Sequence, residues 1–281
     1  MKKNNFLSIV AAAATAAIVF SGCDKKERPG LGSYLQDANP ASGPLKFYAS
    51  FNGTSTDAQL GALDSIQFTK PITNNMTFAD GINGSRGVAG DGSQFIKYGK
   101  PNNFANWAES FTVSFWEKRN GMPVGEAEFP FSISSTNGNW AGTSMMLLFD
   151  HAGAGATDAL AVIKMYLVDR DMGEAWLTWE GGNKVSGVQD NQWHHLAFVY
   201  DATTSKITLY VDGVANGNQP TWGTHGRVLL DYGKISGFQI GGRPKEDLGW
   251  GRSWTGNLDQ FRMYASALTA AEVQALFANK Q

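Results

Sequence analysis

Two adjacent histidines in the stretch NQWHHLAFVYD, residues 191–201, are the first side chains that could do chemistry. An imidazole can bind a metal ion or transfer a proton near neutral pH. The alternation of residues around His194 and His195 predicts a strand, in which neighbouring side chains point to opposite faces of the sheet. The two rings then cannot share one metal ion, which would need the spacing His-x-His. We expect both histidines to pack and to form hydrogen bonds.

Two pairs of acidic residues have a spacing that a glycosidase could use. A retaining glycosidase places two carboxylates about 5 Å apart, which residues i and i+2 of one strand can satisfy. Glu126 and Glu128 have this spacing, but the surrounding GMPVGEAEFPF predicts a loop. Asp169 and Asp171 share it in LVDRDMGE, which predicts a turn. The chain has no G-x-S-x-G, H-E-x-x-H or C-x-x-C motif, so catalysis is left open and is not favoured.

Several tryptophans lie in loop-like sequence with glycine and polar neighbours. Such rings are costly to expose unless a partner covers them. They could stack on the C–H faces of sugars while arginines bind hydroxyls or an acidic sugar; alternatively, the loops fold back and bury the rings. The candidate glycan-binding residues are Trp140, Trp222, Arg243, Trp250, Arg252 and Trp254. Among them, Trp250 and Trp254 are the expected stacking platform.

The elements that must position these side chains are strands. From Leu45 onwards apolar and polar residues alternate, as in ESFTVSFWEKR and SKITLYVDGV, and clusters of Gly, Asn, Asp and Pro separate the runs. Asp212-Gly213 is the two-residue signal for a tight hairpin. We expect the strand of residues 196–200 to pair with residues 206–212.

One segment near the C-terminus has a helical pattern. In SALTAAEVQALFANK, Thr269 is the predicted N-cap and Glu272 follows three residues later, which is the spacing of a capping box. The helix, residues 268–278, would turn an apolar face that includes Val273 and Phe277 inward. The number and spacing of the strands predict an all-β fold of two packed antiparallel sheets with this one short helix.

The N-terminus has the features of a targeting segment. Two lysines precede an apolar run, residues 6–20, that is shorter than the roughly 20 residues a bilayer requires. F-S-G-C at its end resembles the lipobox of bacterial lipoproteins, with Phe20 where leucine is usual. We expect residues 1–22 to be a lipoprotein signal peptide and Cys23, the only cysteine, to be lipidated. The alternative is an ordinary signal peptide with an incidental cysteine.

The stretch after the cysteine is polar and rich in turn-forming residues. DKKERPGLGSYLQDANPASGP predicts a flexible tether over residues 23–44, followed by a folded domain at 45–281. The charged residues directly after Cys23 weakly resemble the export signal of surface-displayed lipoproteins of some Gram-negative bacteria. We therefore expect a lipid anchor in the outer membrane, a domain facing the cell exterior, and no other membrane contact.

The charge balance argues against nucleic acid as a partner. The chain has 23 basic and 25 acidic residues, and removing residues 1–22 takes two lysines away, which leaves 21 and 25 and a net charge of −4. Such a surface offers no basic patch for phosphate backbones.

Two long motifs resemble one known family. NQWHHLAFVYDATTSKITLYVDGV and GNLDQFRMYASALTAAEVQALF are similar, in order and spacing, to the W-H-H…L-Y-V-D-G strands and the closing strand and helix of laminin-G-like domains. With ESFTVSFW upstream, the resemblance covers nearly all of residues 45–277. It implies the fold of the concanavalin A-like family, a two-sheet antiparallel jelly-roll sandwich.

The resemblance also implies a metal site. Members of this family often carry one structural calcium ion between the loop after the first strand and the closing strand. The matching residues are Asn52, Asp57 and Asp259, and Asn52 stands where many relatives have aspartate. Calcium requires six to eight oxygen ligands, so carbonyl groups would have to complete the site.

The expected function is binding rather than catalysis. We expect a non-catalytic, carbohydrate-binding surface lipoprotein that captures glycans or polysaccharide, for surface transporters or glycan-degrading enzymes as partners. The alternative is a protein-binding adhesion module, because laminin-G-like domains also bind proteins through their loops. A glycoside hydrolase or polysaccharide lyase of the same fold is less favoured.

Overall fold

The computed structural model describes residues 43–56 and 70–280. The described residues all belong to one compact unit. The signal peptide, Cys23, most of the tether and Asp57 therefore lie outside the described part, and the expectations for them stay predictions. Within that part, no helix is both long and apolar enough to cross a bilayer.

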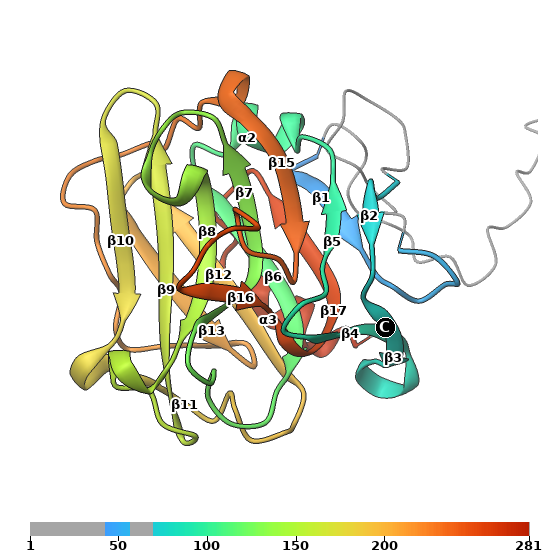
Figure 1. Cartoon of the computed structure of the whole chain (residues 1–281). Helices are drawn as coiled ribbons and strands as arrows, with labels where there is room; N and C mark the ends of the chain where they lie inside the picture. The colour runs from blue at the N-terminus through green and yellow to red at the C-terminus, as the bar shows by residue number, and fades with distance from the viewer. Residues whose placement is uncertain (1–42, 57–69, 281) are drawn as a thin grey trace, which may run out of the picture. The chain divides into compact units, whose positions relative to one another are not determined.

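Two sheets packed face to face make up the described domain, as Figure 1 shows. The order across the first sheet is β14 (Val214–Ala215), β13 (Lys206–Val211), β12 (His194–Asp201), β6 (Phe111–Lys118), β17 (Thr255–Tyr264), β4 (Arg86–Asp91) and β3 (Thr77–Asp80), with β1 (Leu45–Ala49) beside β17. The order across the second is β10 (Gly173–Trp179), β9 (Leu160–Asp169), β8 (Thr143–Asp150), β7 (Ala127–Ser135), β15 (Ile235–Ile240), β5 (Ile96–Tyr98) and β2 (Thr73–Asn74), with β11 (Val185–Ser186) beside β9 and β16 (Gly251–Ser253) beside β7. Among these pairs only β16 and β7 run parallel.

Alternating side chains explain the central core. On β6, Phe111, Val113 and Phe115 point between the sheets and are fully buried. They meet the inward side chains of the facing sheet, including Phe131 and Ile133 of β7, in one continuous apolar cluster. The predicted all-β, two-sheet jelly-roll sandwich is confirmed.

The predicted hairpin is also confirmed. β12 and β13 pair antiparallel from Leu196 opposite Val211 to the other end of the strands. Asp212 and Gly213 have φ angles of 51° and 78°, and Val211 pairs with Val214 across them. Two positive φ angles at the centre of a two-residue loop define the type I′ turn that matches the twist of a hairpin.

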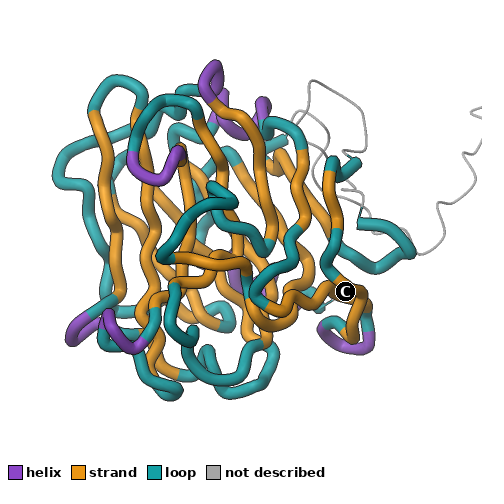
Figure 2. Tube along the Cα trace, in the orientation of Figure 1, coloured by secondary structure: helices purple, strands orange, loops and turns teal. Residues whose placement is uncertain are grey.

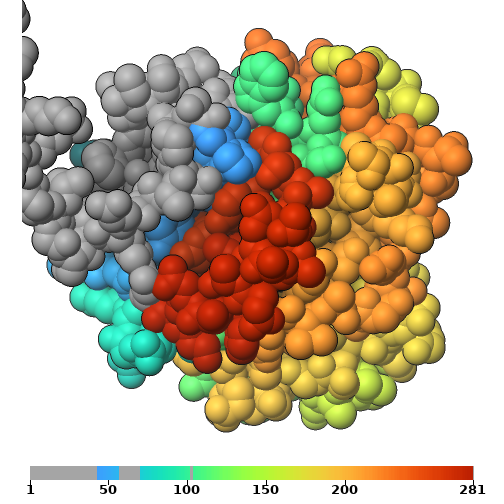
Figure 3. All heavy atoms as spheres, turned by 180° about the vertical axis from the view of Figure 1, so that it is seen from behind, coloured from blue at the N-terminus to red at the C-terminus, as the bar shows by residue number. Residues whose placement is uncertain are grey.

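The C-terminal helix, α3 (Ala270–Ala278), forms as expected. Thr269 and Glu272 make both hydrogen bonds of the capping box, and Val273 is fully buried. Phe277 stacks on Trp116 with ring centroids 5.7 Å apart. From behind, the C-terminal segment is seen to lie across the outer face of the first sheet (Figure 3).

One α-helix was not predicted from the sequence. α2 (Asn102–Trp107) is less than two turns long, and no amphipathic pattern can develop over so few residues. The remaining helical turns are of the 3-10 type, namely η1 (Ile82–Gly84), η2 (Trp140–Gly142), η3 (Ala152–Ala154), η4 (Gly181–Asn183) and η5 (Tyr232–Lys234).

Candidate functional site

The outer face of the second sheet, which points away from the core, carries its own apolar cluster. Loops and short helical turns lie over the front of this sheet in Figure 2. The cluster consists of Ala127, Phe129, Met146, Leu148, Tyr166, Val168 and Leu248, with Ala141 and Trp250 packed against it. A register shift in β7 between Glu128 and Phe131 places Phe129 on this outer face, although Phe131 lies in the core. An apolar outer face of this kind needs either a cover or a ligand.

Tyrosine and tryptophan residues form one side of the site. Met146, Tyr166 and Trp176 are in register on β8, β9 and β10, so they lie side by side. Trp140, from η2, packs edge-on against Trp176 at 5.0 Å and stacks on Trp250 at 4.5 Å. Trp140 and Trp176 keep 43% and 39% of their surface exposed. Two partly exposed tryptophan side chains therefore lie together at one place on the sheet.

Charged groups form the other side. Two residues beyond the Tyr166–Trp176 pair, on the same face of the sheet, Lys164 of β9 lies opposite Thr178 of β10. The Lys164 ammonium lies 3.0 Å from Asp150 Oδ2 and 3.2 Å from Glu180 Oε2. Burial opposes the charge of Lys164, but its hydrogen bonds to Asp150 and Glu180 outweigh burial and raise its pKa. Both carboxylates thus contact one ammonium group.

These two sides enclose a pocket of about 470 Å³. Its lining consists of Trp140, Leu148, Asp150, His151, Lys164, Trp176, Thr178, Glu180 and Trp250. Pockets that hold small molecules are usually 300–1,000 Å³, lined with aromatic groups and a few polar ones. The His151 side chain lies at the rim, where its Nδ1 accepts a hydrogen bond from the Gly153 N–H at 3.0 Å.

The structure brings together two of the four predicted tryptophans. Trp140 and Trp250 are stacked neighbours in the pocket. The expectation for Trp254 is wrong, because its ring is 0% exposed and packs in the core against Phe149. Trp222 stacks on His225 with ring centroids 3.6 Å apart, and among the described residues no ring contact joins it to the pocket.

The two predicted arginines have protein partners instead of a free approach to a ligand. Arg243 donates to the carbonyls of Leu248 and Gly251 at 3.2 and 2.6 Å, so it fixes the loop that carries Trp250. Arg252 donates from Nε to Glu128 Oε1 at 3.0 Å. Their expected contact with sugar hydroxyls or an acidic sugar is therefore not supported; Arg243 positions the site indirectly.

Comparison of the sequence with known families gives a match over most of the domain. A laminin G family model, described as the concanavalin A-like lectin/glucanases superfamily, matches residues 90–274. The chain belongs to this superfamily. No curated protein matches the chain.

Solved structures of low identity share the superfamily fold. Domain 4 of AbnA, a GH43 extracellular arabinanase from Geobacillus stearothermophilus in complex with arabinotriose, is 19% identical with a TM-score of 0.51, covering 84% of this chain and 98% of that one. The botulinum neurotoxin serotype G binding domain is 13% identical with a TM-score of 0.58, covering 83% and 50%. The binding domain of botulinum neurotoxin DC in complex with SialylT is 11% identical with a TM-score of 0.54, covering 86% and 53%. The chain spans about half the length of these neurotoxin domains.

The two histidines of the superfamily motif occupy separate environments. His195 is buried beneath α3, where Ser114 Oγ lies 2.8 Å from its Nε2, and burial lowers the His195 pKa to about 3. The His194 ring lies between Asp212 at 2.8 Å and Asp190 at 2.9 Å. The hydrogen bond to Asp212, together with that to Asp190, outweighs burial and raises the pKa of His194 to about 9. The expectation that these histidines pack and form hydrogen bonds is confirmed.

The acidic pairs considered from the sequence do not form a catalytic site. Glu128 was expected in a loop, but β7 already begins at Ala127, and Glu128 is fully buried against Arg119 at 3.2 Å. Asp169 accepts hydrogen bonds from the backbone N–H groups of Asp171 and Met172 at 2.8 and 2.9 Å, which closes the predicted turn.

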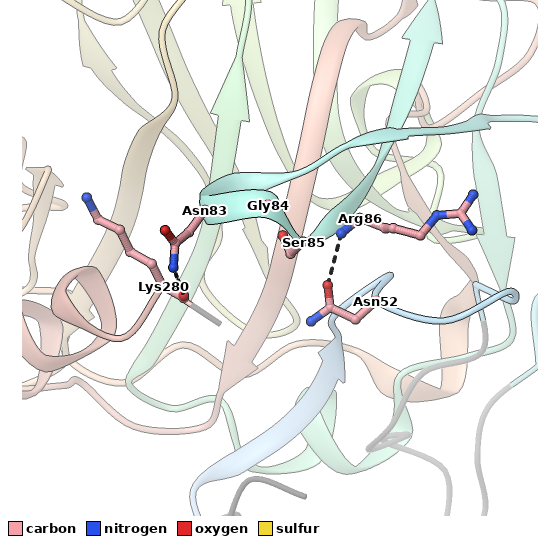
Figure 4. Close-up of a pocket in the computed structure, with 6 residues that line it drawn as sticks. All are labelled: Asn52, Asn83, Gly84, Ser85, Arg86 and Lys280. Carbon is pink, nitrogen blue, oxygen red and sulfur yellow. Dashed lines mark hydrogen bonds between the residues drawn. The ribbon is translucent and has the colours of Figure 1, made fainter. Parts of the chain in front are cut away.

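The region expected to hold calcium is built around Asp259. Its Oδ2 accepts from the Ile82 N–H at 2.9 Å and from the Ser85 hydroxyl at 2.8 Å, and its Oδ1 accepts from the Gln260 N–H at 2.7 Å. Figure 4 shows Asn52 in the neighbouring hollow, with its Oδ1 accepting from the Arg86 N–H at 3.2 Å. A cation would have to displace these donors, so the described residues do not by themselves fit a calcium site. Because Asp57 lies outside them, calcium stays a prediction.

Sequence reasoning missed the strand residues of the pocket. These are Leu148, Asp150, Lys164, Trp176 and Thr178, together with His151 and Glu180, which follow directly after β8 and β10. One signal was available in AWLTWE, where Trp176 alternates with the core residues Leu177 and Trp179 and therefore shares a face with polar Thr178. A large aromatic ring on the polar face of a strand is a candidate ligand contact.

Proposed function

We propose that this protein is a non-catalytic glycan-binding module whose binding site is the pocket on the outer face of the second sheet. The observation that carries the proposal is the pair of exposed rings, Trp140 and Trp176, facing the charged group of Asp150, Lys164 and Glu180. The rings offer flat apolar surfaces to the C–H faces of a sugar, and the carboxylates accept hydrogen bonds from its hydroxyls.

The charged group favours binding over hydrolysis. A glycosidase needs one carboxyl that keeps its proton until it protonates the leaving group, which requires a raised pKa. Asp150 and Glu180 both contact the ammonium of Lys164, at 3.0 and 3.2 Å. Both carboxylates are therefore engaged by a cation of the protein, and the described lining of the pocket contains no further acidic residue to serve as the general acid.

The similar structures support a carbohydrate ligand. The AbnA domain was solved with arabinotriose and one neurotoxin binding domain with SialylT. Another neurotoxin DC binding domain was solved with rat synaptotagmin II, a protein receptor. The pocket geometry favours the carbohydrate here, since two exposed indoles above a cluster of hydrogen-bonding groups suit a sugar ring better than a flat protein surface.

The cellular setting is part of the proposal. Lipidation at Cys23 and the tether of residues 23–44 would hold the domain at the outer membrane, facing the exterior, where it would capture polysaccharide for surface transporters or glycan-degrading enzymes. Mass spectrometry of the membrane fraction should find an acylated peptide that begins at Cys23. A mature protein with an unmodified and different N-terminus contradicts the anchor but not the binding site.

A glycan array tests the binding function directly. The mature chain carrying Cys23→Ser, which cannot be lipidated, is compared with the same chain carrying Trp176→Ala or Trp107→Ala. Trp107 is 66% exposed on α2 and does not line the pocket, so it is a matched control. We expect binding to be lost with Trp176→Ala and kept with Trp107→Ala. Absence of any bound glycan, with a protein partner recovered instead, would replace this function with protein adhesion.

A further inference from the structure

A second hollow lies directly beside the pocket. It has a volume of about 560 Å³ and shares one lining residue with the pocket, Trp250. Its other lining residues include Asn139, Ala141, Lys245, Asp247 and Gly249. Trp140 lines the first pocket and its chain neighbours Asn139 and Ala141 line the second hollow, so the same two loops contribute to both.

Trp250 lines both hollows, and its stack with Trp140 is held firmly. Trp250 rests on Phe129 with ring centroids 5.6 Å apart. Arg243 donates to the Leu248 and Gly251 carbonyls on either side of Trp250, which fixes its loop. A ligand that fills both hollows must cross this pair of rings.

Neither hollow offers an unpaired cation. In the first pocket, Lys164 is held by two carboxylates. In the second hollow, Lys245 Nζ lies 3.4 Å from Asp247 Oδ1. The described lining residues carry two carboxylates and one ammonium group in the first pocket and one of each in the second hollow, so neither offers a uronic or sialic acid a surplus of positive charge.

We infer that the ligand is an internal segment of an uncharged, linear polysaccharide that crosses the Trp140–Trp250 pair and places sugar units in both hollows. The inference rests on the proposed function and specifies its ligand class. A site with two connected hollows gains contacts as the chain lengthens, whereas a single pocket is saturated by one or two units. Chain length and ligand charge are therefore the two quantities to vary.

Titration calorimetry with oligosaccharide ladders of two to six units tests the inference. The probes are ladders from cellulose, β-1,3-glucan, xylan and arabinan, and oligogalacturonates as the acidic counterpart. For the neutral ladder that binds, we expect affinity to rise at least about tenfold from the dimer to the hexamer, the difference that about 1.4 kcal/mol of added contact makes. Oligogalacturonates should bind at least about tenfold more weakly than the neutral hexamer.

A variant that narrows the second hollow tests whether the affinity gained by longer oligosaccharides comes from contacts there. A Cβ on Gly249 would meet nothing within 4 Å, so Gly249→Leu can narrow the second hollow, while Gly99→Leu, which is equally open and lines neither hollow, is the matched control. We expect Gly249→Leu to bring hexamer affinity down to about that of the native dimer complex, and Gly99→Leu to keep the native hexamer affinity. Asn139→Ala, a second change in the same hollow, should also lower hexamer affinity. Agreement between the two variants would show that the loss does not come from a folding defect of Gly249→Leu.

The results separate this inference from the proposed function. Affinity that does not depend on chain length, a Gly249→Leu variant that binds the hexamer as the native chain does, or equal binding of oligogalacturonate overturns the inference while Trp176→Ala still abolishes binding. If no ladder binds and Trp176→Ala changes nothing on the array, the proposed function fails and the inference falls with it.

Discussion

The outer faces of the two sheets carry similar side chains but differ in how far these side chains are buried. On the first sheet, Trp116 and His195 lie beneath α3, and Phe277 of the helix stacks on Trp116. On the second sheet, Trp176 lies on a strand in the same way but remains 39% exposed. Both faces are apolar enough to need a cover. On the first face α3 buries these rings, whereas on the second face loops bury the apolar cluster but leave Trp140 and Trp176 partly exposed. We propose that a ligand covers these two rings.

The interior shows a parallel contrast between two buried glutamates. Glu128 of the second sheet is held by Arg119, by Arg252 and by the Thr255 N–H. Glu117 of the first sheet is equally buried, yet neither of its carboxylate oxygens has a hydrogen-bond partner among the described residues. Burial raises the pKa of Glu117 to about 8, against the smaller opposing effect of Arg119.

Disrupting the packing of α3 on the first sheet should have the largest effect on the free energy of unfolding. Val273→Asp places a carboxylate at a fully buried position under α3, and burying an unpaired charge is expected to cost roughly 3–5 kcal/mol of unfolding free energy. The control is Ala271→Asp, which lies exposed in the first turn of the same helix, where a negative charge is favourable. Urea unfolding measures both. Equal stability of the two variants would show that α3 is not a structural cover.

Removing the charge of Glu117 should have the next largest effect, and it should stabilise. Because the folded-state pKa lies above the ordinary 4.5, the contribution of Glu117 to stability is fully present below pH 4.5 and is lost as the pH rises towards about 8, where the buried group ionises. Glu117→Gln keeps the shape and removes the ionisation. We expect it to gain on the order of 2–4 kcal/mol at pH 8, at about 1.4 kcal/mol per pKa unit.

The control for this prediction is the same change at the partnered glutamate. Glu128→Gln removes the charge that faces Arg119 and Arg252, so it should lose stability at pH 8. Urea unfolding at pH 5 and pH 8 distinguishes the two variants. A Glu117→Gln protein that is less stable than the native chain at pH 8 would mean that Glu117 has a partner outside the described residues.

On the open face, truncation should affect binding more than folding. Trp176→Ala removes an exposed ring face, so we expect a loss of at least about tenfold in glycan affinity, or about 1.4 kcal/mol, with a change below about 1 kcal/mol in unfolding free energy. Trp116→Ala, on the covered face, should give the reverse: binding kept and roughly 3–5 kcal/mol of stability lost. Calorimetry and urea unfolding on both variants test the contrast between the faces. If Trp176→Ala destabilises as much as Trp116→Ala, the second face is a structural surface too.

The sequence predicted a feature correctly when residues close to it in the chain determine that feature. The hairpin at Asp212-Gly213 and the capped helix after Thr269 follow from signals within a few residues, and both predictions were confirmed. Trp250 and Trp254 have the same glycine-rich surroundings, yet one lines the pocket and the other lies in the core. That difference is set by the pairing of β16 with β7, which joins residues more than a hundred positions apart.

Trp176 is a residue whose exposure the sequence could not predict. Its strand alternates regularly, and an alternating strand has the same pattern whether its outer face is open or covered by a helix. Trp116 in SFWEKR looks no different from Trp176 in AWLTWE. What distinguishes them is α3, whose docking position is a tertiary property. The fold was therefore predictable from periodicity and motif, whereas the site required knowledge of which face stays uncovered.

Calcium should have the smallest effect. Asp259 already accepts hydrogen bonds from Ile82, Ser85 and Gln260, so the turn it holds does not depend on an ion.

Extracellular modules bind calcium with dissociation constants of about 0.1–1 mM, so about 1 mM calcium would add roughly 0.4–1.4 kcal/mol by mass action. For a domain of this size that raises the melting temperature by about 1–5 °C. Thermal unfolding in calcium, magnesium and EDTA measures it: if the predicted ion binds, the rise occurs in calcium alone. Burial, against the opposing hydrogen bonds, raises the pKa of Asp259 to about 6. Protonation should therefore compete with the ion, and the rise should shrink below pH 6. Equal melting temperatures in all three conditions at pH 7.5 would remove the predicted ion and leave Asp259 as a purely hydrogen-bonded anchor of the first sheet.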